Sequence, residues 1–290
     1  MFYQSIRIQI AIITKLINNT KFKIDKGDHL LDTHTHILWN IDDGSKNQCM
    51  SLQMLEIAAR SGTKAIFATP HVTERANKPS WEEIKEKTQQ LRQLCAEAQI
   101  DIMLYPGAEV QMNWELLPEL GATGAYCLNG GRYLLIELPA AEIPAYADEF
   151  WYELELKGIT PILAHPERYQ QLRENPDLLL LWRRRGMLMQ CNSGSFTGMF
   201  GSSVCENAKV LLANGLVDLL GSDGHRSEGR NTDMSRAAAV IRQLAGEEVL
   251  RQLTETNPQA ILKNQEIELK QPKVLLEDKP KSFWQKLFGK

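Results

Sequence analysis

The feature that most constrains the fold is an alternation of short apolar runs with longer segments of helical periodicity, which begins near residue 29 and stops near residue 265. Repeats of this kind are typical of strand–helix units with parallel strands. We expect seven strands, most of them followed by a helix. The expected strands cover 29–32, 64–69, 100–105, 132–138, 160–164, 187–191 and 216–220, and the helices 51–60, 80–98, 143–156, 177–185, 204–213 and a region beyond 233.

The positions of the polar residues favour a closed barrel over an open sheet. In chain order, the residues that follow the seven strands are His34 and His36, His71, Glu109, Glu137, His165, Asn192, and Asp223 with His225. Barrels of this class build their sites at the carboxyl ends of the strands, and only closure brings all seven ends together. An open doubly wound sheet is the alternative. We therefore predict an α/β fold, an irregular (βα)7 barrel related to the TIM type.

Five of the six histidines are among these residues, which makes a shared role more plausible than five unrelated packing positions. His34 and His36 are two residues apart, so both side chains point to the same side of an extended chain. A mixture of imidazoles and carboxylates suits Mn²⁺, Fe or Zn²⁺ better than Ca²⁺. The candidates, counting Asp43, are too many for one ion, so we predict two or three divalent ions that activate water and clamp phosphoryl oxygens.

Three further polar features flank this set. Asp42-Asp43-Gly44 follows the first strand, and a turn explains at least one of these acids without a ligand role. Arg168 lies three residues after His165, and Arg230 lies five residues after His225. Guanidinium groups at the rim of a metal site would bind phosphate bidentately and stabilise its charge. Surface arginines are common, so spacing alone leaves these roles open.

Composition excludes several other classes of protein. The 36 acidic and 33 basic residues give a net charge of −3, so nucleic acid is not an expected partner. The five cysteines form no C-x-x-C pair, which argues against a disulfide framework or a zinc knuckle and favours a reducing, cytoplasmic setting. None of them is followed by arginine at the sixth position, so the C-x5-R motif of thiol phosphatases is absent from the sequence.

Eight motifs occur in a characteristic order: Asp32-Thr-His34-Thr-His36, Ile41-Asp-Asp-Gly44, Thr69-Pro-His71, Gly107-Ala-Glu109, Leu135-Ile-Glu137, His165-Pro-Glu-Arg168-Tyr169, Gln190-Cys-Asn-Ser193 and Ser222-Asp-Gly-His225. In these motifs the chain resembles the PHP (polymerase and histidinol phosphatase) superfamily, and within it the bacterial capsule and exopolysaccharide protein-tyrosine phosphatases. The resemblance covers about residues 30–265. The one departure, Cys191 in place of a small aliphatic residue, should alter packing only.

The resemblance implies a manganese-favouring site of two or three ions that hydrolyses phosphotyrosine on the C-terminal tail of a bacterial tyrosine kinase controlling polysaccharide export. It implies Arg168 and Arg230 as phosphate-binding residues, with His225 as a catalytic residue as well as a ligand. The implied metal ligands are His34, His36, Asp43, His71, Glu109, Glu137, His165, Asp223 and His225. The expected mechanism is direct attack of activated water, without a covalent phosphoenzyme.

Two other readings stay open. The first is a PHP phosphatase for a small molecule such as histidinol phosphate, or a phosphodiesterase. The second is a non-catalytic PHP binding module, against which the complete ligand set argues. The sequence leaves the oligomeric state undecided.

The two ends of the chain lie outside the alternating pattern. Residues 1–28 are expected to be an extension, too short and too charged in their apolar part to serve as a membrane span. Residues 266–290 are expected to be a tail that is either flexible or amphipathic. Its last part, 279–290, carries four lysines and no acid, which suits weak contact with an anionic membrane, so a peripheral position at the inner membrane accompanies the cytoplasmic prediction.

Overall fold

Seven stretches of the chain form parallel strands, and two of them are interrupted. The computed structural model describes residues 29–74, 78–120, 124–270 and 272. The second stretch is divided between Ala68 and His71, where Pro70 has no N–H to donate to a ladder. The third is divided between Pro106 and Glu109. The strands are β1 (Leu30–Thr35), β2 (Thr63–Ala68), β3 (His71–Val72), β4 (Met103–Pro106), β5 (Glu109–Gln111), β6 (Tyr133–Glu137), β7 (Thr160–Ala164), β8 (Leu188–Asn192) and β9 (Leu219–Gly221).

The interrupted strands join two parallel sheets into one ring. One sheet has the order β1-β2-β4 and the other β3-β5-β6-β7-β8-β9. The two sheets are continuous with each other, because β3 continues the β2 stretch and β5 continues the β4 stretch. A parallel bridge between Thr35 and Gly224 brings the last strand region back to the first, and the Asp223 N–H donates to the His34 carbonyl at 2.7 Å. The prediction of an irregular seven-stranded barrel is confirmed.

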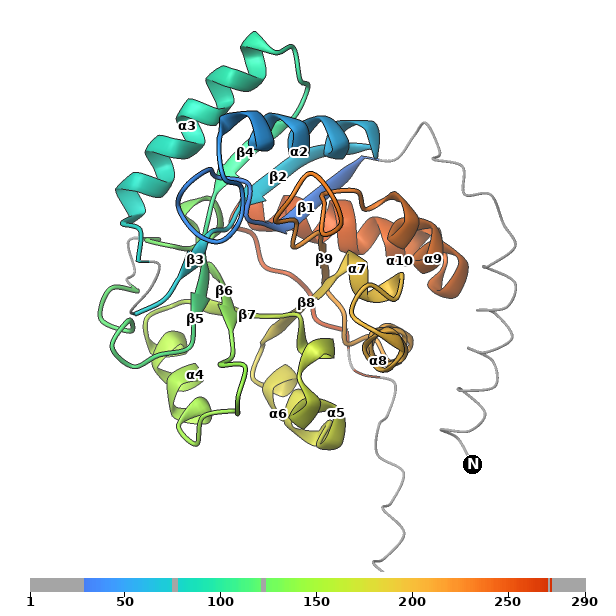
Figure 1. Cartoon of the computed structure of the whole chain (residues 1–290). Helices are drawn as coiled ribbons and strands as arrows, with labels where there is room; N and C mark the ends of the chain where they lie inside the picture. Colours follow the sequence, from blue (N-terminus) through green and yellow to red (C-terminus); the bar gives the residue numbers. More distant parts are fainter. Residues whose placement is uncertain (1–28, 75–77, 121–123, 271, 273–290) are drawn as a thin grey trace, which may run out of the picture.

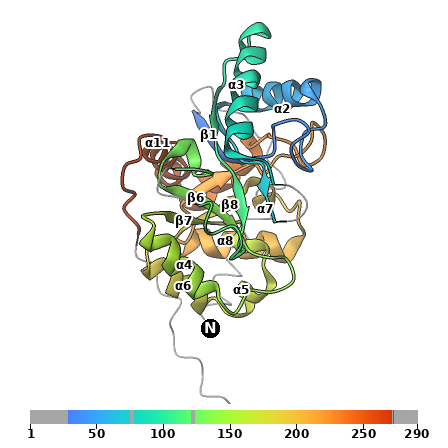
Figure 2. The same cartoon turned by 90° about the vertical axis from the view of Figure 1, so that its left-hand side faces the viewer.

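Helices surround the ring. Figures 1 and 2 both place α2 and α3 on one side of the strands and α4, α5, α6 and α8 on another. The α-helices are α2 (Gln48–Arg60), α3 (Trp81–Glu97), α4 (Ala147–Leu156), α5 (Gln170–Glu174), α6 (Asp177–Arg184), α7 (Ser193–Phe196), α8 (Ser202–Ala213), α9 (Ser235–Ala245), α10 (Glu247–Arg251) and α11 (Asn257–Leu262). Short 3-10 turns cover Leu128–Gly130 and Pro166–Arg168, and a π turn covers Gln252–Thr256.

Helix α8 begins two residues before its expected start, and two other helix starts differ from the expectation for a local reason. Helix α2 begins three residues early, because the Asn47 side chain accepts the Met50 N–H at 2.9 Å and so caps the helix. Helix α4 begins at Ala147 rather than Ile143, because Pro144 biases the residue before it away from helical backbone. The expected cap of α3 is present, with the Ser80 hydroxyl accepting the Glu83 N–H at 3.1 Å.

In β2 and in β6 to β9, alternate residues belong to two apolar clusters. In β6, Leu134 and Ile136 pack into the large cluster that the helices complete. Leu135 points the other way and joins a smaller cluster with Ile162 and Leu219 from neighbouring strands. Aliphatic side chains, together with Phe67 and Tyr133, therefore fill the inside of the ring, and the polar residues collect at its carboxyl end.

Most residues of the two predicted end segments lie outside the described residues. Residues 1–28, 271 and 273–290 are outside the described residues, and Ile267 packs into the smaller apolar cluster. Among the residues that the structure describes, no helix combines the length and hydrophobicity that a membrane crossing needs.

Candidate metal centre

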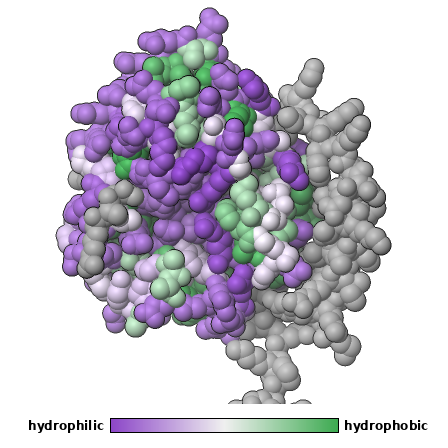
Figure 3. Space-filling model, viewed as in Figure 1, coloured by the Kyte–Doolittle hydropathy of each residue, from purple (hydrophilic) through white to green (hydrophobic). Residues whose placement is uncertain are grey.

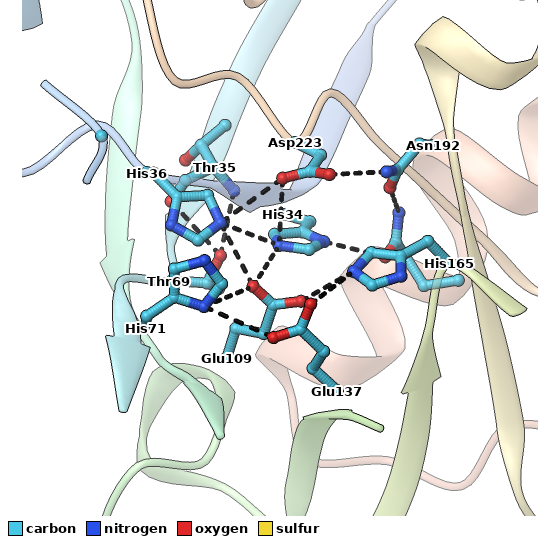
Figure 4. A network of polar contacts seen from close by, with 12 residues as sticks. His34, Thr35, His36, Thr69, His71, Glu109, Glu137, His165, Asn192 and Asp223 are labelled. Atoms are coloured by element: carbon cyan, nitrogen blue, oxygen red, sulfur yellow. Dashed lines mark hydrogen bonds and ion pairs between the residues drawn. The ribbon is translucent and has the colours of Figure 1, made fainter. Parts of the chain in front are cut away.

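The structure brings all nine predicted ligands and both predicted arginines together at the carboxyl ends of the strands. Figure 4 shows seven of the ligands, His34, His36, His71, Glu109, Glu137, His165 and Asp223, pointing toward a common centre. Asp43 reaches the same centre from the loop after β1, and His225 from the loop after β9. The sixth histidine, His29, is exposed before β1, at the opposite end of that strand.

The innermost group contains four potential ligand atoms. The Nε2 atoms of His34 and His36 are 3.1 Å apart. Both face the Oε2 atom of Glu109, at 3.1 and 3.3 Å, and the Oδ1 atom of Asp223, at 3.6 and 3.4 Å. Ligand atoms about 2.1 Å from one tetrahedral ion would be separated by roughly 3.4 Å. The spacing of this group therefore fits a single divalent ion.

Glu109 connects this group to two others. Its Oε1 atom lies 2.9 Å from Nε2 of His165, which is also 3.6 Å from Oε1 of Glu137. Its Oε2 atom lies 3.1 Å from Nδ1 of His71. His71, Glu109 and Glu137 offer one ligand atom each within 4.8 Å of one another. One carboxylate therefore faces several neighbouring ligand groups, as a bridging ligand in a multinuclear site does.

The third group lies toward the mouth of the site. Asp43 Oδ1 is 3.4 Å from Nε2 of His225 and 3.7 Å from Nε2 of His71, and His36 completes the set. Asp43 is more exposed than the inner carboxylates, with 60% of its side chain accessible. Three groups of ligand atoms fit the predicted number of two or three ions.

Two buried oxygens show why a cation suits this arrangement. Glu109 Oε2 and Asp223 Oδ1 are buried and have no hydrogen-bond partner. A buried carboxylate oxygen without a partner is costly unless a cation or a proton lies beside it. The imidazoles next to these oxygens are also oriented so that a ring nitrogen faces the centre. The Nδ1 atom of His34 faces Gln190 Oε1 at 2.9 Å and that of His36 faces Asp42 Oδ2 at 2.7 Å, so each Nε2 is left for the centre.

Asp42 is a functional candidate that the sequence pattern does not indicate, because a turn accounts for at least one acid of Asp42-Asp43-Gly44. It is the turn-forming acid, since its Oδ1 accepts the Gly44 N–H at 2.8 Å. Its Oδ2 also accepts from His36 Nδ1 and, at 2.9 Å, from the backbone N–H of His71. Asp42 thus fixes two predicted ligands from outside. The adjacent position of two acids was the only signal in the sequence.

Gln190 and Asp32 are two more supporting residues that the sequence patterns did not single out as functional. Gln190 holds His34, as described above. Asp32 is fully buried in β1, and its Oδ1 accepts the Ser222 N–H at 2.8 Å and the His34 N–H at 3.2 Å. Burial raises the Asp32 pKa to about 6. The signal available in advance was their place inside the motifs that carry His34 and Asp223.

The inner histidines and carboxylates shift one another's pKa values through their charges. Burial alone would lower the pKa of His34 and His36. Glu109 and Asp223 raise the pKa of His34 above its usual range, and Asp42, Asp223 and Glu109 raise that of His36. Burial would likewise raise the pKa of Glu109 and Asp223, and the neighbouring imidazoles hold both well below the usual range. The carboxylates therefore require positive charge at the centre, which protons on the imidazoles or divalent ions can supply.

The outer residues are shifted in the opposite directions. Burial and the nearby His36 lower the pKa of His71 to about 4, and burial with the same neighbour lowers the pKa of His225. Burial and the charge of Glu109 raise the pKa of Glu137 to about 7. His71 and His225 are therefore neutral at pH 7, the form in which imidazole binds metal.

Asp223 joins the ligand groups to the two arginines. While its Oδ1 faces the imidazoles, its Oδ2 accepts from Arg168 Nη1 at 3.2 Å, from Arg230 Nη2, and from Asn192 Nδ2 at 2.6 Å. About 31% of the Arg168 side chain and 30% of the Arg230 side chain are accessible. Both guanidinium groups therefore lie at the mouth of the site with further N–H groups available.

Close packing of the backbone positions several of these side chains. A Cβ atom on Gly44 would lie 2.2 Å from the His36 carbonyl oxygen, and one on Gly221 would lie 2.5 Å from the His34 Cβ. His165 and Asp223 have positive φ angles of 35° and 52°, which non-glycine residues rarely adopt. Such strained backbone is concentrated at functional sites.

Comparison with known proteins agrees with this geometry. The sequence model of a family described as capsular polysaccharide synthesis, CpsB/CapC, matches residues 30–263, most of the chain. The chain belongs to the CpsB/CapC family. The match lies within the region of about residues 30–265 over which the resemblance was predicted, and the predicted resemblance is confirmed.

Individual members of the CpsB/CapC family are similar over nearly their whole length. Tyrosine-protein phosphatase YwqE of Bacillus subtilis is 34% identical over 238 residues, which cover 82% of this chain and 93% of the relative. Tyrosine-protein phosphatase CpsB of Streptococcus pneumoniae is 28% identical over 241 residues, 81% of this chain and 99% of the relative. A solved chain from the crystal structures of YwqE and CpsB, described as unique metal-dependent tyrosine phosphatases, superposes with a TM-score of 0.80 at 33% identity, covering 86% of this chain and all of that one.

Proposed function

We propose that this chain is a metal-dependent protein-tyrosine phosphatase that hydrolyses phosphotyrosine with two or three divalent ions, manganese by preference. The observation that carries the proposal is the double use of Asp223, which touches the predicted metal ligands with one oxygen and both arginines with the other. A phosphate held by the arginines therefore lies next to the ligand groups. Relatives named tyrosine-protein phosphatases support the reaction.

The chain's own residues divide the work between them. His34, His36, Glu109 and Asp223 would hold an inner ion; Glu137 and His165, with Glu109, a second; and Asp43, His71 and His225 a third. When bound, such ions activate water and neutralise phosphoryl oxygens. This set contains no thiolate, which excludes the soft sulfur-based sites and suits manganese, iron or zinc.

Arg168 and Arg230 bind the phosphoryl group. Asp223 and Asn192 keep the two guanidinium groups in place, since Asn192 donates to the same Asp223 oxygen that both arginines share. Their planar N–H edges can pair with two phosphoryl oxygens each, and the charge they neutralise grows as the phosphorus–oxygen bond breaks. The departing phenolate has a parent pKa near 10, far below that of an alkoxide, so it needs little assistance.

The substrate we propose is a phosphotyrosine in the C-terminal tail of a bacterial tyrosine kinase that controls capsule or exopolysaccharide synthesis, with the enzyme in the cytoplasm. Family membership in capsular polysaccharide synthesis supports this partner. The open position of both arginines supports a protein-borne phosphate over a fully enclosed metabolite.

A comparison of three substrates tests the proposed function. The chelated protein is replenished with Mn²⁺, Fe²⁺ or Zn²⁺ and assayed on a phosphotyrosine peptide, the matching phosphoserine peptide and histidinol phosphate. We expect the highest kcat/KM on phosphotyrosine with Mn²⁺. Preference for histidinol phosphate would refute the substrate, and turnover without metal would refute the mechanism.

A further inference from the structure

One aromatic side chain, Phe200, contacts both arginines and has no part in the proposed hydrolysis. The Phe200 ring centroid is 4.7 Å from Arg168 Cζ and 5.7 Å from Arg230 Cζ. Both distances are within the range of cation–π contact. A guanidinium that stacks on a ring through its face keeps its N–H edge free for hydrogen bonds. Phe200 therefore contacts both arginines without competing for a phosphate.

The loop that carries Phe200 is tightly built. The Met199 N–H donates to the Gly194 carbonyl at 2.9 Å, which folds residues 197–201 back onto α7. A Cβ atom on Gly194 would lie 2.9 Å from Met199 Sδ and 3.1 Å from Phe200 Cε2, so a side chain there would displace both. The absence of a side chain at Gly194 thus allows Phe200 to pack closely beside Arg168.

Helix α7, onto which this loop folds, is hydrogen-bonded to the segment that carries Arg168. Glu167 Oε1 accepts the Ser195 hydroxyl at 2.7 Å and the Asn192 N–H at 2.9 Å. Glu167 and Ser195 are both fully buried. This buried contact, close to both Phe200 and Arg168, therefore fixes the position of the ring relative to Arg168.

The loop presents an apolar surface at the mouth of a polar site. Met199 is 48% exposed and Phe200 is half-buried. Figure 3 shows an apolar patch over α7 and the start of α8, directly beside the hydrophilic centre of that face. An exposed apolar patch next to a catalytic site is a common place for a substrate to bind.

We propose that Phe200 determines specificity for aryl phosphates. The aryl ring of the substrate packs against the Phe200 ring and Met199, and Phe200 also orients Arg168 and Arg230. The proposal rests on the proposed function, since it concerns the aromatic ring that bears the phosphate. The site then distinguishes an aryl phosphate from an alkyl phosphate by contact with the ring, in addition to the better leaving group.

Non-hydrolysable analogues separate the ring contact from leaving-group chemistry. Phenylphosphonate and methylphosphonate carry the same kind of anion, and only the first has a ring. Each is measured as a competitive inhibitor of metal-loaded enzyme, together with inorganic phosphate. Aromatic pairs contribute about a two- to ten-fold change in binding. We expect wild-type enzyme to bind phenylphosphonate about five- to ten-fold more tightly than methylphosphonate.

Two substitutions at one position test the ring itself. Phe200→Leu keeps an apolar side chain but removes the ring, and we expect it to reduce the phenyl-to-methyl preference to less than about two-fold. Phe200→Tyr keeps the ring and should retain the preference. Met199→Ala should weaken phenylphosphonate alone. Thermal unfolding of each variant checks that the fold is intact.

Tyr152→Leu is the matched control. Tyr152 is 56% exposed and lines a cavity with Tyr133 and Thr160, at the amino-terminal ends of β6 and β7, away from the site. It should change none of the inhibition constants.

The outcomes separate the two proposals. An unchanged phenyl-to-methyl ratio in Phe200→Leu overturns the specificity role even when the enzyme hydrolyses phosphotyrosine. An equal loss for phenylphosphonate, methylphosphonate and inorganic phosphate also overturns it, because the ring would then act only through the arginines. A wild-type enzyme that hydrolyses no phosphotyrosine refutes the proposed function, and the inference with it.

Discussion

Replacing Asp42 by asparagine tests whether the predicted metal ligands depend on a residue that touches no ion itself. The Asp42 side chain is fully buried, and its two oxygens accept from His36 Nδ1 at 2.7 Å, His71 N–H at 2.9 Å and Gly44 N–H at 2.8 Å. An amide has one acceptor oxygen, so one face of the side chain must turn an NH₂ group toward an N–H donor. The negative charge beside His36 is also lost.

The expected effect is a weaker metal site rather than an unfolded protein. Residues that orient a metal-binding histidine typically contribute 10- to 100-fold to metal affinity. This corresponds to about 1.4–2.8 kcal/mol. Because Asp42 contacts two of the predicted ligands, we expect Asp42→Asn to fall in the upper half of that range, with a kcat that largely recovers at saturating metal.

Calorimetric titration of the chelated protein with Mn²⁺ measures this effect directly, and activity against free Mn²⁺ gives an independent value. Asp101→Asn is the control, because Asp101 is 93% exposed and pairs with Lys64 on the surface. Asp43→Asn should reduce the number of ions bound as well as the affinity. Unchanged Mn²⁺ affinity in Asp42→Asn, with a normal unfolding transition, would refute the reasoning.

Three other predictions follow from the same contacts. Because the His36 pKa is raised, metal-free protein holds a proton on His36 at neutral pH. Mn²⁺ binding should therefore release roughly one to two protons and should weaken as the pH falls. Calorimetry in buffers of different ionisation enthalpy measures the proton release. Arg230→Lys should lower kcat/KM about 100-fold and weaken inhibition by inorganic phosphate, because lysine cannot bind phosphate bidentately. Arg183→Met leaves the buried carboxylate of Asp218 unpaired and should cost about 3–5 kcal/mol in urea unfolding, while the exposed neighbour Arg184→Met should cost almost nothing.

The sequence allowed prediction of the barrel and the gathering of polar residues, because both depend on periodicity. Apolar runs of strand length separated by helices give parallel strands, and the histidines and acids after them meet only if the ring closes. The structure has that ring. The assignment of the nine residues as metal ligands, and of Arg168, Arg230 and His225 as catalytic, stays a prediction.

What escaped prediction depends on contacts between distant residues. The division of the second strand could not be predicted from Pro70, because a proline at the end of a strand is equally common in a loop. Asp42 acts through hydrogen bonds to His36 and His71, and Gln190 acts through a hydrogen bond to His34. Periodicity carries no information about such pairs. Phe200 follows Met199 in a short loop, and only the folded chain shows that its ring contacts two arginines.

We propose that a cluster of ions held by these residues carries out the hydrolysis. The most direct measurement follows turnover of a phosphotyrosine peptide while chelated protein is titrated with Mn²⁺ and the bound metal is counted by mass spectrometry. We expect no activity in metal-free protein, a rise as two or three ions bind per chain, and no rise in Glu109→Gln. Turnover that persists in metal-free protein, or that is complete with one ion per chain, would rule out a multinuclear catalytic site.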